Sequence, residues 1–260
     1  MKKQITLALY ICLLVYTSSY TQQNSRALYK LILSKNGKAP MYYELLNQPF
    51  KSSFTFIHKE TPKKVILDEL TDEVTLNQTS PDSIQQFIFT DFKKNMIFSK
   101  EYLTEDNGNS YREIQVYEPI SVRWRFQNEI KKIDNYLCKK AITHFRGRNY
   151  TAWYSEDIPI FQGPWKFHGL PGLLFELIDD SGDVSFFLEK IEIPYHEEIS
   201  EHGHTFTKAI TAIDFFKLKD KASRKSNKAF ETAILSKLPR GATIELTKDG
   251  NNDIEKNFQK

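Results

Sequence analysis

The stretch GPWKFHGLPGLLFELIDDSGD, residues 163–183, constrains the fold more than any other part of the sequence. Glycine reaches positive φ and proline fixes φ, so the Gly/Pro pairs at 163–164 and 171–172 predict a corner in the chain. The tryptophan and phenylalanine between the two pairs are bulky enough to fill one open end of a sheet. The apolar run at 173–179 then predicts a buried strand.

Two glycines of this corner carry a more specific expectation. Gly169 and Gly172 have no side chain, so a ring or another backbone segment can approach them closely. We also expect Gly172 to take a positive φ, which a β-branched residue reaches only with strain. The sequence therefore predicts that Gly172→Val lowers stability strongly.

Aromatic and β-branched runs bounded by Gly, Pro and Asn recur along the chain and predict a mainly β fold. Pro119 marks an edge, a bulge or a break in one of them. The expected strands are 27–35, 51–60, a pair within 83–103, 111–126, a hairpin of 136–145 with 150–156 around the turn 146–149, and a hairpin of 173–179 with 184–193 around the turn 180–183.

The C-terminal part reads differently. Apolar residues recur at helical spacing over 214–238, and Ser226 or Asn227 could cap a second helical piece there. Pro239 and Gly241 end the pattern, and residues 242–246 are a candidate last strand. With no repeat or linker-like composition, we expect one β domain over 22–246, followed by a polar tail at 247–260.

The N-terminus predicts export. Two lysines precede an apolar run at 5–16 and then small polar residues, which is typical of a cleaved signal peptide over residues 1–21. That run is too short to cross a membrane, which needs about 20 apolar residues. The formal net charge of +3 is small for 260 residues, so the composition does not indicate a nucleic-acid partner.

Cys138 is the single cysteine that remains after such a cleavage. The mature chain then has no internal disulfide, and its stability must come from the core. The simplest interpretation is a small buried hydrophobic residue. An intermolecular bridge or a soft-metal ligand is the alternative.

The segment IPYHEEISEHGH, 193–204, is a candidate divalent-metal site, although a solvated polar loop after a strand is the simpler interpretation. Its spacing is not that of a zinc protease. His202 and His204 are two apart, so an extended segment places them on one face. The candidate ligands are His196, His202, His204, Glu198 and Glu201. No other cofactor is indicated, and the sequence lacks a nucleophile elbow, a phosphate loop and a dinucleotide fingerprint.

The peptide HGLPGLLFEL resembles the signature of the GLPGLI family of secreted bacterial proteins, with leucine in place of the last isoleucine. Upstream residues stand in the order that the family shows over about 122–192. The residues singled out by this resemblance, as structural elements of the motif, are Cys138, Trp153, Gly163, Pro164, Trp165, Gly169, Leu170, Pro171, Gly172 and Leu173. The His/Glu segment is not part of the pattern.

The resemblance implies no reaction or ligand, but its strand pattern is similar to lipoprotein-carrier-like domains. That likeness implies a single curved antiparallel sheet, a half-barrel whose concave face can take a hydrophobic ligand, with strand aromatics lining it. We therefore expect an exported binding or accessory protein of the periplasm or outer membrane, whose partner is an outer-membrane protein or a lipid-like ligand. The alternatives are a metal-binding protein and a hydrolase with an unidentified site.

Overall fold

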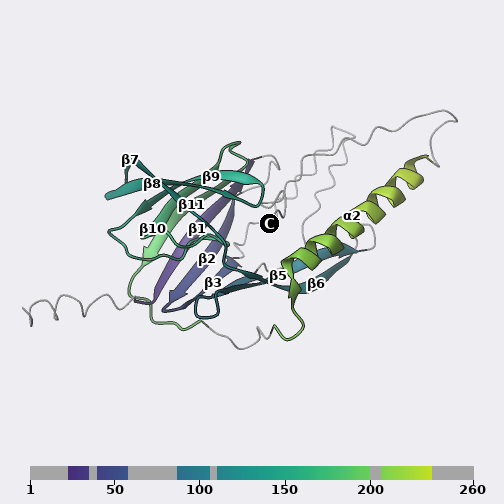
Figure 1. Cartoon of the computed structure of the whole chain (residues 1–260), viewed down its shortest axis with the longest axis horizontal. Helices are drawn as coiled ribbons and strands as arrows, with labels where there is room; N and C mark the ends of the chain where they lie inside the picture. Colours follow the sequence, from purple (N-terminus) through teal and green to yellow (C-terminus); the bar gives the residue numbers. More distant parts are fainter. Residues whose placement is uncertain (1–22, 35–39, 58–86, 106–109, 200–205, 236–260) are drawn as a thin grey trace, which may run out of the picture.

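A computed structural model describes residues 23–34, 40–57, 87–105, 110–199 and 206–235, and the strands in these ranges form one sheet (Figure 1). The elements in chain order are β1 (Ser25–Leu33), β2 (Met41–Gln48), β3 (Lys51–Ile57), β4 (Phe87–Asp91), β5 (Met96–Glu105), β6 (Ser110–Pro119), β7 (Arg125–Ile133), β8 (Tyr136–Phe145), β9 (Arg148–Ser155), β10 (Leu173–Asp179), β11 (Val184–Glu192), β12 (Ile210–Thr211) and α2 (Ala212–Leu235). The expectation of a mainly β fold with a C-terminal helix is confirmed.

The strands lie in the order β12-β6-β5-β4-β3-β2-β1-β11-β10-β9-β8-β7. Every pairing is antiparallel except the short parallel contact of β12 with β6. The sheet therefore consists of two series of hairpins, β1 to β6 and β7 to β11, joined where β1 pairs with β11.

The predicted hairpins are confirmed, and each of their turns contains a glycine or asparagine at positive φ. The turn between β8 and β9 is Arg146-Gly147, at φ 53° and 77°, and Gly182 at φ 70° lies in the turn between β10 and β11. Strands β4 and β5 pair around a turn that contains Asn95. Glycine and asparagine take this region at low cost, so local sequence determines these connections.

Three strands were not predicted from the sequence: β2, β7 as a strand separate from β6, and β12. The helix also differs from expectation, because it is one continuous element over Ala212–Leu235 rather than two pieces. Its start is set by Thr211, whose Oγ1 accepts a hydrogen bond from the Asp214 backbone N–H at 3.1 Å and donates to Asp214 Oδ2 at 2.8 Å. This is an N-cap with the acidic partner in the first turn. The candidate strand at 242–246 lies outside the described residues.

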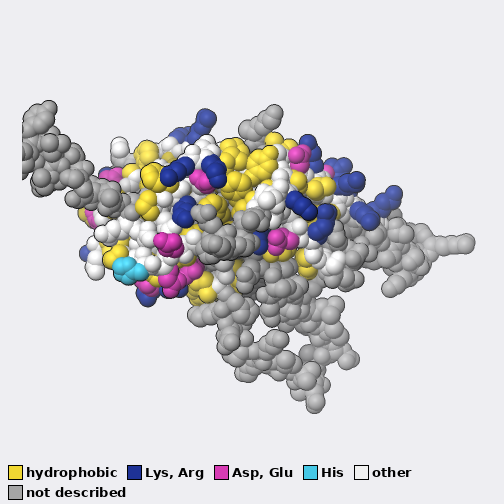
Figure 2. All heavy atoms as spheres, turned by 90° about the horizontal axis from the view of Figure 1, so that it is seen from below, with side chains coloured by type: hydrophobic (Ala, Val, Ile, Leu, Met, Phe, Trp, Pro, Cys, Tyr) yellow, Lys and Arg dark blue, Asp and Glu magenta, His cyan; other side chains and the backbone are white. Residues whose placement is uncertain are grey.

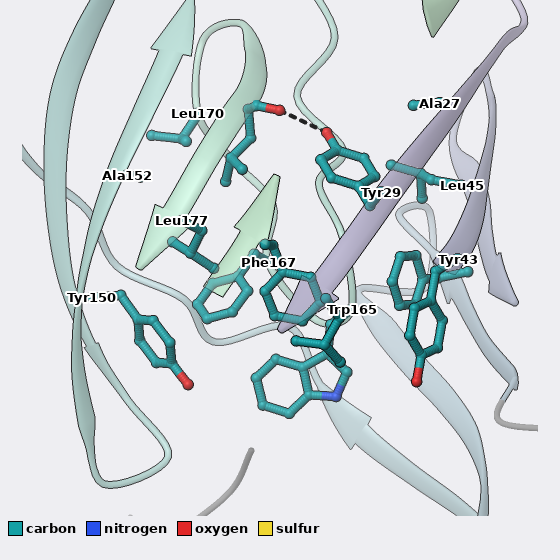
Figure 3. Close-up of a cluster of buried hydrophobic side chains, with 14 of the residues drawn as sticks. Ala27, Tyr29, Tyr43, Leu45, Tyr150, Ala152, Trp165, Phe167, Leu170 and Leu177 are labelled. Atoms are coloured by element: carbon teal, nitrogen blue, oxygen red, sulfur yellow. Dashed lines mark hydrogen bonds between the residues drawn. The ribbon is translucent and has the colours of Figure 1, made fainter. Parts of the chain in front are cut away.

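The sheet is strongly curved, and its inner face encloses the main core. Residues from strands far apart in the order, such as Tyr43 of β2, Ile97 of β5 and Tyr154 of β9, belong to one buried cluster. Figure 3 shows this cluster, with the Tyr29 hydroxyl donating a hydrogen bond to the Leu174 carbonyl at 2.7 Å. A flat sheet could not bring these side chains together, so the core itself requires the curvature.

A second, smaller cluster covers the outer face of the same sheet. Strand residues alternate between faces, so Cys138 lies opposite Ala141 of the inner core. Cys138, Leu173 and Phe175 pack there with Ile158 and Ile160. Strands β8 to β10 are therefore covered on both sides.

Helix α2 lies at the opposite end of the sheet and projects past it (Figure 1). Ala212 and Phe215 in its first turns pack on Val116 of β6. Its basic side chains, Lys217 and Arg224 among them, are largely exposed, and Figure 2 shows Lys and Arg side chains grouped at this end of the molecule. Within the described ranges, no helix combines the length and the apolar character needed to cross a membrane.

Candidate functional site

The connection 156–172, called the corner from here on, links β9 to β10 and covers both faces of the sheet. Its first part carries Ile158 and Ile160 of the outer cluster. Its second part carries Trp165, Phe167 and Leu170 into the inner core (Figure 3). The corner therefore fills the concave side of the sheet with its own aromatic side chains.

Backbone hydrogen bonds hold the corner in one conformation. The N–H of Gly163 donates to the Phe167 carbonyl at 2.9 Å, and the N–H of Gly169 donates to the Phe161 carbonyl at 2.7 Å. Trp165 has φ 55°, a left-handed conformation that costs a bulky residue roughly 1–2 kcal/mol. Contacts of its ring with Phe145 and Phe167 accompany this strain.

The two glycines of the GLPGLL peptide have roles different from those expected. Gly169, not Gly172, takes the positive φ, at 87°, and a Cβ there would meet no atom within 4 Å. A Cβ on Gly172 would lie 2.0 Å from the Ser155 carbonyl oxygen. The predicted φ of Gly172 is therefore wrong, and the expected close approach is confirmed at Gly172 but not at Gly169.

The corner also carries a buried ion cluster. Lys166 Nζ lies 2.9 Å from Glu118 Oε1, with only 3% and 4% of the two side chains exposed. Arg146, from the turn between β8 and β9, forms an ion pair with the same carboxylate, and Glu101 lies 3.7 Å from Lys166 Nζ. Because Glu118 lies near the end of β6 and Arg146 in the turn between β8 and β9, this cluster connects strands that are far apart in the sheet order. It holds the curved sheet closed around its core.

A second buried ion cluster holds the hairpin of β10 and β11. Arg148 lies 2.6 Å from Asp179 Oδ2 and 3.4 Å from Asp183 Oδ2. Asp179 also accepts from the Val184 backbone N–H and from Ser181. Although burial opposes ionisation, these hydrogen bonds and Arg148 together hold the pKa of Asp179 below its usual value. The segment DDSGD thus forms the hairpin turn predicted for it.

His168 is a buried neutral histidine within the corner. Its Nδ1 lies 2.9 Å from the Lys166 carbonyl oxygen, so Nδ1 carries the proton. Its backbone carbonyl accepts a hydrogen bond from Trp124 Nε1 at 2.8 Å. Burial lowers the pKa of His168 to about 4, and the bond to Lys166 offsets this only in part.

His168 predicts a loss of stability in mild acid. The unfolded chain binds this proton with a pKa near 6.5 and the folded chain only near 4, so stability falls as pH drops from about 6.5 to 4. Between pH 7 and pH 5 we expect a loss of about 2 kcal/mol that His168→Asn abolishes. Urea unfolding of both proteins at the two pH values measures it, and equal losses in both would contradict the assignment.

The other residues of the family resemblance lie in or next to these packed layers. Cys138 is buried in the outer cluster, and burial raises the pKa of its thiol to about 11, so little reactive thiolate exists at neutral pH. Trp153 is half-buried, with Lys131 Nζ at 4.5 Å from its ring centroid. Pro164, Leu170 and Leu173 are buried, whereas Pro171 is exposed.

The candidate metal ligands are only partly within the described ranges. His196 and Glu198 are exposed on the segment after β11. Glu201, His202 and His204 lie outside the described residues, and among those that are described no group of three His, Cys, Asp or Glu side chains could hold a metal ion. Metal binding by this segment stays a prediction.

An open groove lies where the inner face of the sheet meets strand β7. Its volume is about 490 Å³, and we call it the β7 groove; it is lined by Phe126, Gln127, Asn128, Ile130, Lys139, Tyr154, Glu156 and Pro171. A register shift in the pairing of β7 with β8, a β-bulge between Phe126 and Ile130, shapes this wall.

Apolar side chains are unusually exposed around the β7 groove. Phe126, Ile130 and Leu137 are 57%, 62% and 63% exposed. Pairing places Phe126 opposite Ala141 and Ile130 opposite Lys139, and alternation along β8 puts Leu137 on the same inner face. Three exposed apolar residues on one face form a patch, which soluble proteins rarely leave without a partner.

Polar groups of the groove flank this patch. Lys139 Nζ and Glu156 Oε2 form an ion pair at 2.6 Å across the inner face. The ring of Tyr154 packs edge-on against Phe126, with the centroids 6.1 Å apart. Burial, and then the nearby Glu156, raise the pKa of the Tyr154 phenol, so its hydroxyl stays protonated at neutral pH and can donate a hydrogen bond. The arrangement suits an amphipathic partner.

The corner and the hairpin before it also carry a likeness to a known family. The model of one protein family matches this segment. The model, described as "Protein of unknown function (Porph_ging)", matches residues 143–176, from the end of β8 through β9 and the corner into β10. The GLPGLL peptide lies within the Porph_ging match. A comparison with curated proteins finds no significant match.

Solved structures share parts of this fold at low sequence identity. One structure of PNGF-II has a TM-score of 0.50 at 14% identity and covers 77% of this chain; a second crystal form gives 0.48 at 13% identity. The chain spans about a third of the length of PNGF-II, with 34% and 33% covered. A LolA superfamily protein from Nitrosomonas europaea gives a TM-score of 0.29 at 10% identity, over 70% of this chain and 89% of that one.

The structural comparisons concern the fold alone. A TM-score of 0.50 at 14% identity indicates a shared arrangement of strands, and the score of 0.29 is too low to support an argument. The lipoprotein-carrier-like architecture therefore stays a prediction. The open, curved sheet with one C-terminal helix rests on the described residues themselves.

Proposed function

We propose that this chain is an exported binding protein of the bacterial cell envelope, which holds an amphipathic partner in the β7 groove. The observation that carries this proposal is the patch of Phe126, Ile130 and Leu137, exposed on one face beside a groove that also offers Tyr154. Burying such a patch is favourable by about 25 cal/mol per Å² of apolar surface. An apolar patch that is exposed in the isolated chain therefore marks a surface that a partner covers.

The location of this groove changes where a hydrophobic partner is expected to bind. From the resemblance, strand aromatics were candidates to line a concave cavity. Tyr154 and Phe186 are instead buried in the inner core, where Tyr154 also reaches the wall of the β7 groove, and the corner fills the concave side. Phe87 is buried too, but on the opposite face of the sheet from its neighbour Ile88 of the inner core. The available apolar surface is at the β7 end of the inner face, so we place the partner there.

Export is supported by the sequence pattern over 1–21, with its two lysines and its short apolar run. The single buried cysteine of the mature chain agrees with a protein that relies on its core and ion clusters for stability in an oxidising compartment. A place in the envelope gives the exposed patch access to membrane proteins and lipids.

The proposal predicts that the groove binds an apolar anionic dye, 1-anilinonaphthalene-8-sulfonate. Removing two large apolar side chains from a binding surface costs at least about 1.4 kcal/mol, so Phe126→Ser/Ile130→Ser should weaken dye binding by about tenfold or more. Fluorescence titration of the folded proteins measures this. Phe50→Ser is the matched control, because Phe50 is 55% exposed but lies in the turn between β2 and β3. Equal affinity of the groove variant and the control would contradict the proposal.

A further inference from the structure

The two edges of the sheet differ in how they are protected. At one edge the two-residue strand β12 pairs with β6, and the first turns of α2 pack beside it. At the other edge lies the nine-residue strand β7, which pairs on one side with β8 and, within the described residues, with no strand on its other side. An edge strand of this length presents unpaired backbone groups that can pair with another chain.

We propose that the partner of the β7 groove is an extended, acidic and apolar peptide segment of another protein, which adds to the sheet as a strand beside β7. This inference rests on the proposed function and names the occupant of the same site. Main-chain hydrogen bonds to the edge supply affinity in such complexes, and pockets for alternate side chains supply specificity.

The side chains of the inner face fit this mode of binding. A strand added beside β7 directs every second side chain to the inner face. These side chains reach the exposed Ile130 and, past the bulge, the exposed Phe126, which forms one wall of the groove. The groove is thus continuous with the free edge, and one extended peptide contacts both.

Charge along the edge specifies an acidic segment. Glu129 pairs with Lys140, Lys131 with Glu176, and Lys139 with Glu156, so these charges are compensated. Arg123, Arg125 and Lys132 are exposed and form no ion pair within the described residues, whereas Asp134 in the following turn is the nearby acid. The edge therefore has an excess of positive charge, which attracts carboxylates.

The bulge and the lysines of β7 also have a protective interpretation. Natural edge strands are blunted by bulges and by lysine to prevent aggregation. Protection alone predicts polar side chains on the exposed face, and β7 instead displays Phe126 and Ile130 there, with Leu137 beside them. The bulge limits the pairing of β7 to a short partner segment. The exposed apolar side chains favour a partner segment with apolar residues at matching positions.

Isothermal titration of the purified, exported protein with designed peptides tests the inference. The probe is the eight-residue peptide acetyl-Glu-Val-Asp-Ile-Glu-Val-Asp-Ile-amide, whose aliphatic side chains share one face of a strand. Two further peptides carry N-methyl groups on all aliphatic or on all acidic residues. Each set removes the N–H donors from one edge of the peptide and leaves its side chains intact, because N–H direction also alternates.

Addition beside β7 uses one edge of the peptide, so one N-methylated peptide should bind at least about tenfold more weakly and the other should retain binding. Arg125→Glu should weaken binding of the parent peptide, because Arg125 pairs with Ile142 and lies on the outer face, where the acidic side chains of the added strand point, while Lys221→Glu, an exposed site on α2, should not. Equal binding of all three peptides would overturn the inference, because side chains alone would then account for it. If the protein binds the dye at the groove but not the peptide, the inference is overturned and the proposed function stays intact. If the protein binds neither the dye nor the peptide, both are contradicted.

Discussion

Gly172→Ala should lower the free energy of unfolding by about 3 kcal/mol or more, and Gly172→Val by still more. A Cβ at this position would lie 2.0 Å from the Ser155 carbonyl oxygen, 2.5 Å from its carbon and 2.8 Å from Glu156 Cα. These are backbone atoms at the end of β9, so no side-chain rotation relieves the overlap. The corner would have to move away from the sheet and disturb both packed clusters. Thermal and denaturant unfolding measure the loss, expected as a fall in Tm of roughly 6 °C or more.

Gly169→Ala is the matched control in the same peptide. Gly169 has φ 87°, but a Cβ there meets no atom within 4 Å, so the expected cost is the left-handed conformation alone, roughly 1–2 kcal/mol. Gly169→Asn should cost less than Gly169→Ala, because asparagine tolerates this conformation. If the alanine variants at 169 and 172 lost the same stability, close approach at Gly172 would not be the reason for its glycine.

The same pair of glycines shows what local sequence can predict. The pattern marks positions where a side chain is not tolerated, but it does not distinguish a left-handed φ from a contact with a distant backbone. Turns such as Arg146-Gly147 and the helix start at Thr211 can be predicted from the sequence, because the residues that determine them are neighbours in the chain.

The unpredicted strands lack the alternation on which the prediction depends. Strand β7, Arg125–Ile133, is an edge strand with exposed residues on both faces, so its sequence RFQNEIKKI has no hydrophobic period of two. Strand β12 has two residues and exists because α2 packs beside β6. Strand β2 carries the polar residues Asn47 and Gln48 at buried positions near its end.

The β7 groove could not be predicted from the sequence either. Its walls come from the bulge at 127–129, from Tyr154 in β9 and from Pro171 at the end of the corner. None of these has a local signature of binding, and the exposure of Phe126 and Ile130 becomes apparent only once β7 is known to be the last strand. The sequence indicated the corner well and the candidate site poorly.

The curvature of the sheet depends on contacts between residues distant in sequence, and Glu118 is central to them. Its carboxylate lies at the end of β6 and faces Lys166 of the corner and Arg146 of the turn between β8 and β9. No spacing rule connects these three positions. Pro119 ends β6 directly after Glu118, so the carboxylate lies at a fixed point beside the corner and the turn between β8 and β9.

Glu118→Gln should therefore lower the free energy of unfolding by about 3–5 kcal/mol. The change keeps the shape of the side chain but removes the buried negative charge that two buried cations face. Glu101 lies 3.7 Å from Lys166 Nζ and compensates only in part, because its side chain is 28% exposed and solvent screens it. Denaturant unfolding at pH 7 measures the loss.

Glu129→Gln is the control for this prediction. Glu129 pairs with Lys140 at 2.9 Å, but its side chain is 61% exposed, and such surface pairs contribute about 1 kcal/mol or less. A triple replacement of Glu118, Lys166 and Arg146 by methionine should recover most of the stability, because apolar groups of similar volume can replace a buried ion cluster. A loss from Glu118→Gln no larger than that of the control would mean that the ion cluster does not hold the sheet closed. A triple variant as unstable as Glu118→Gln would mean that these positions need their polar groups for a reason other than charge compensation.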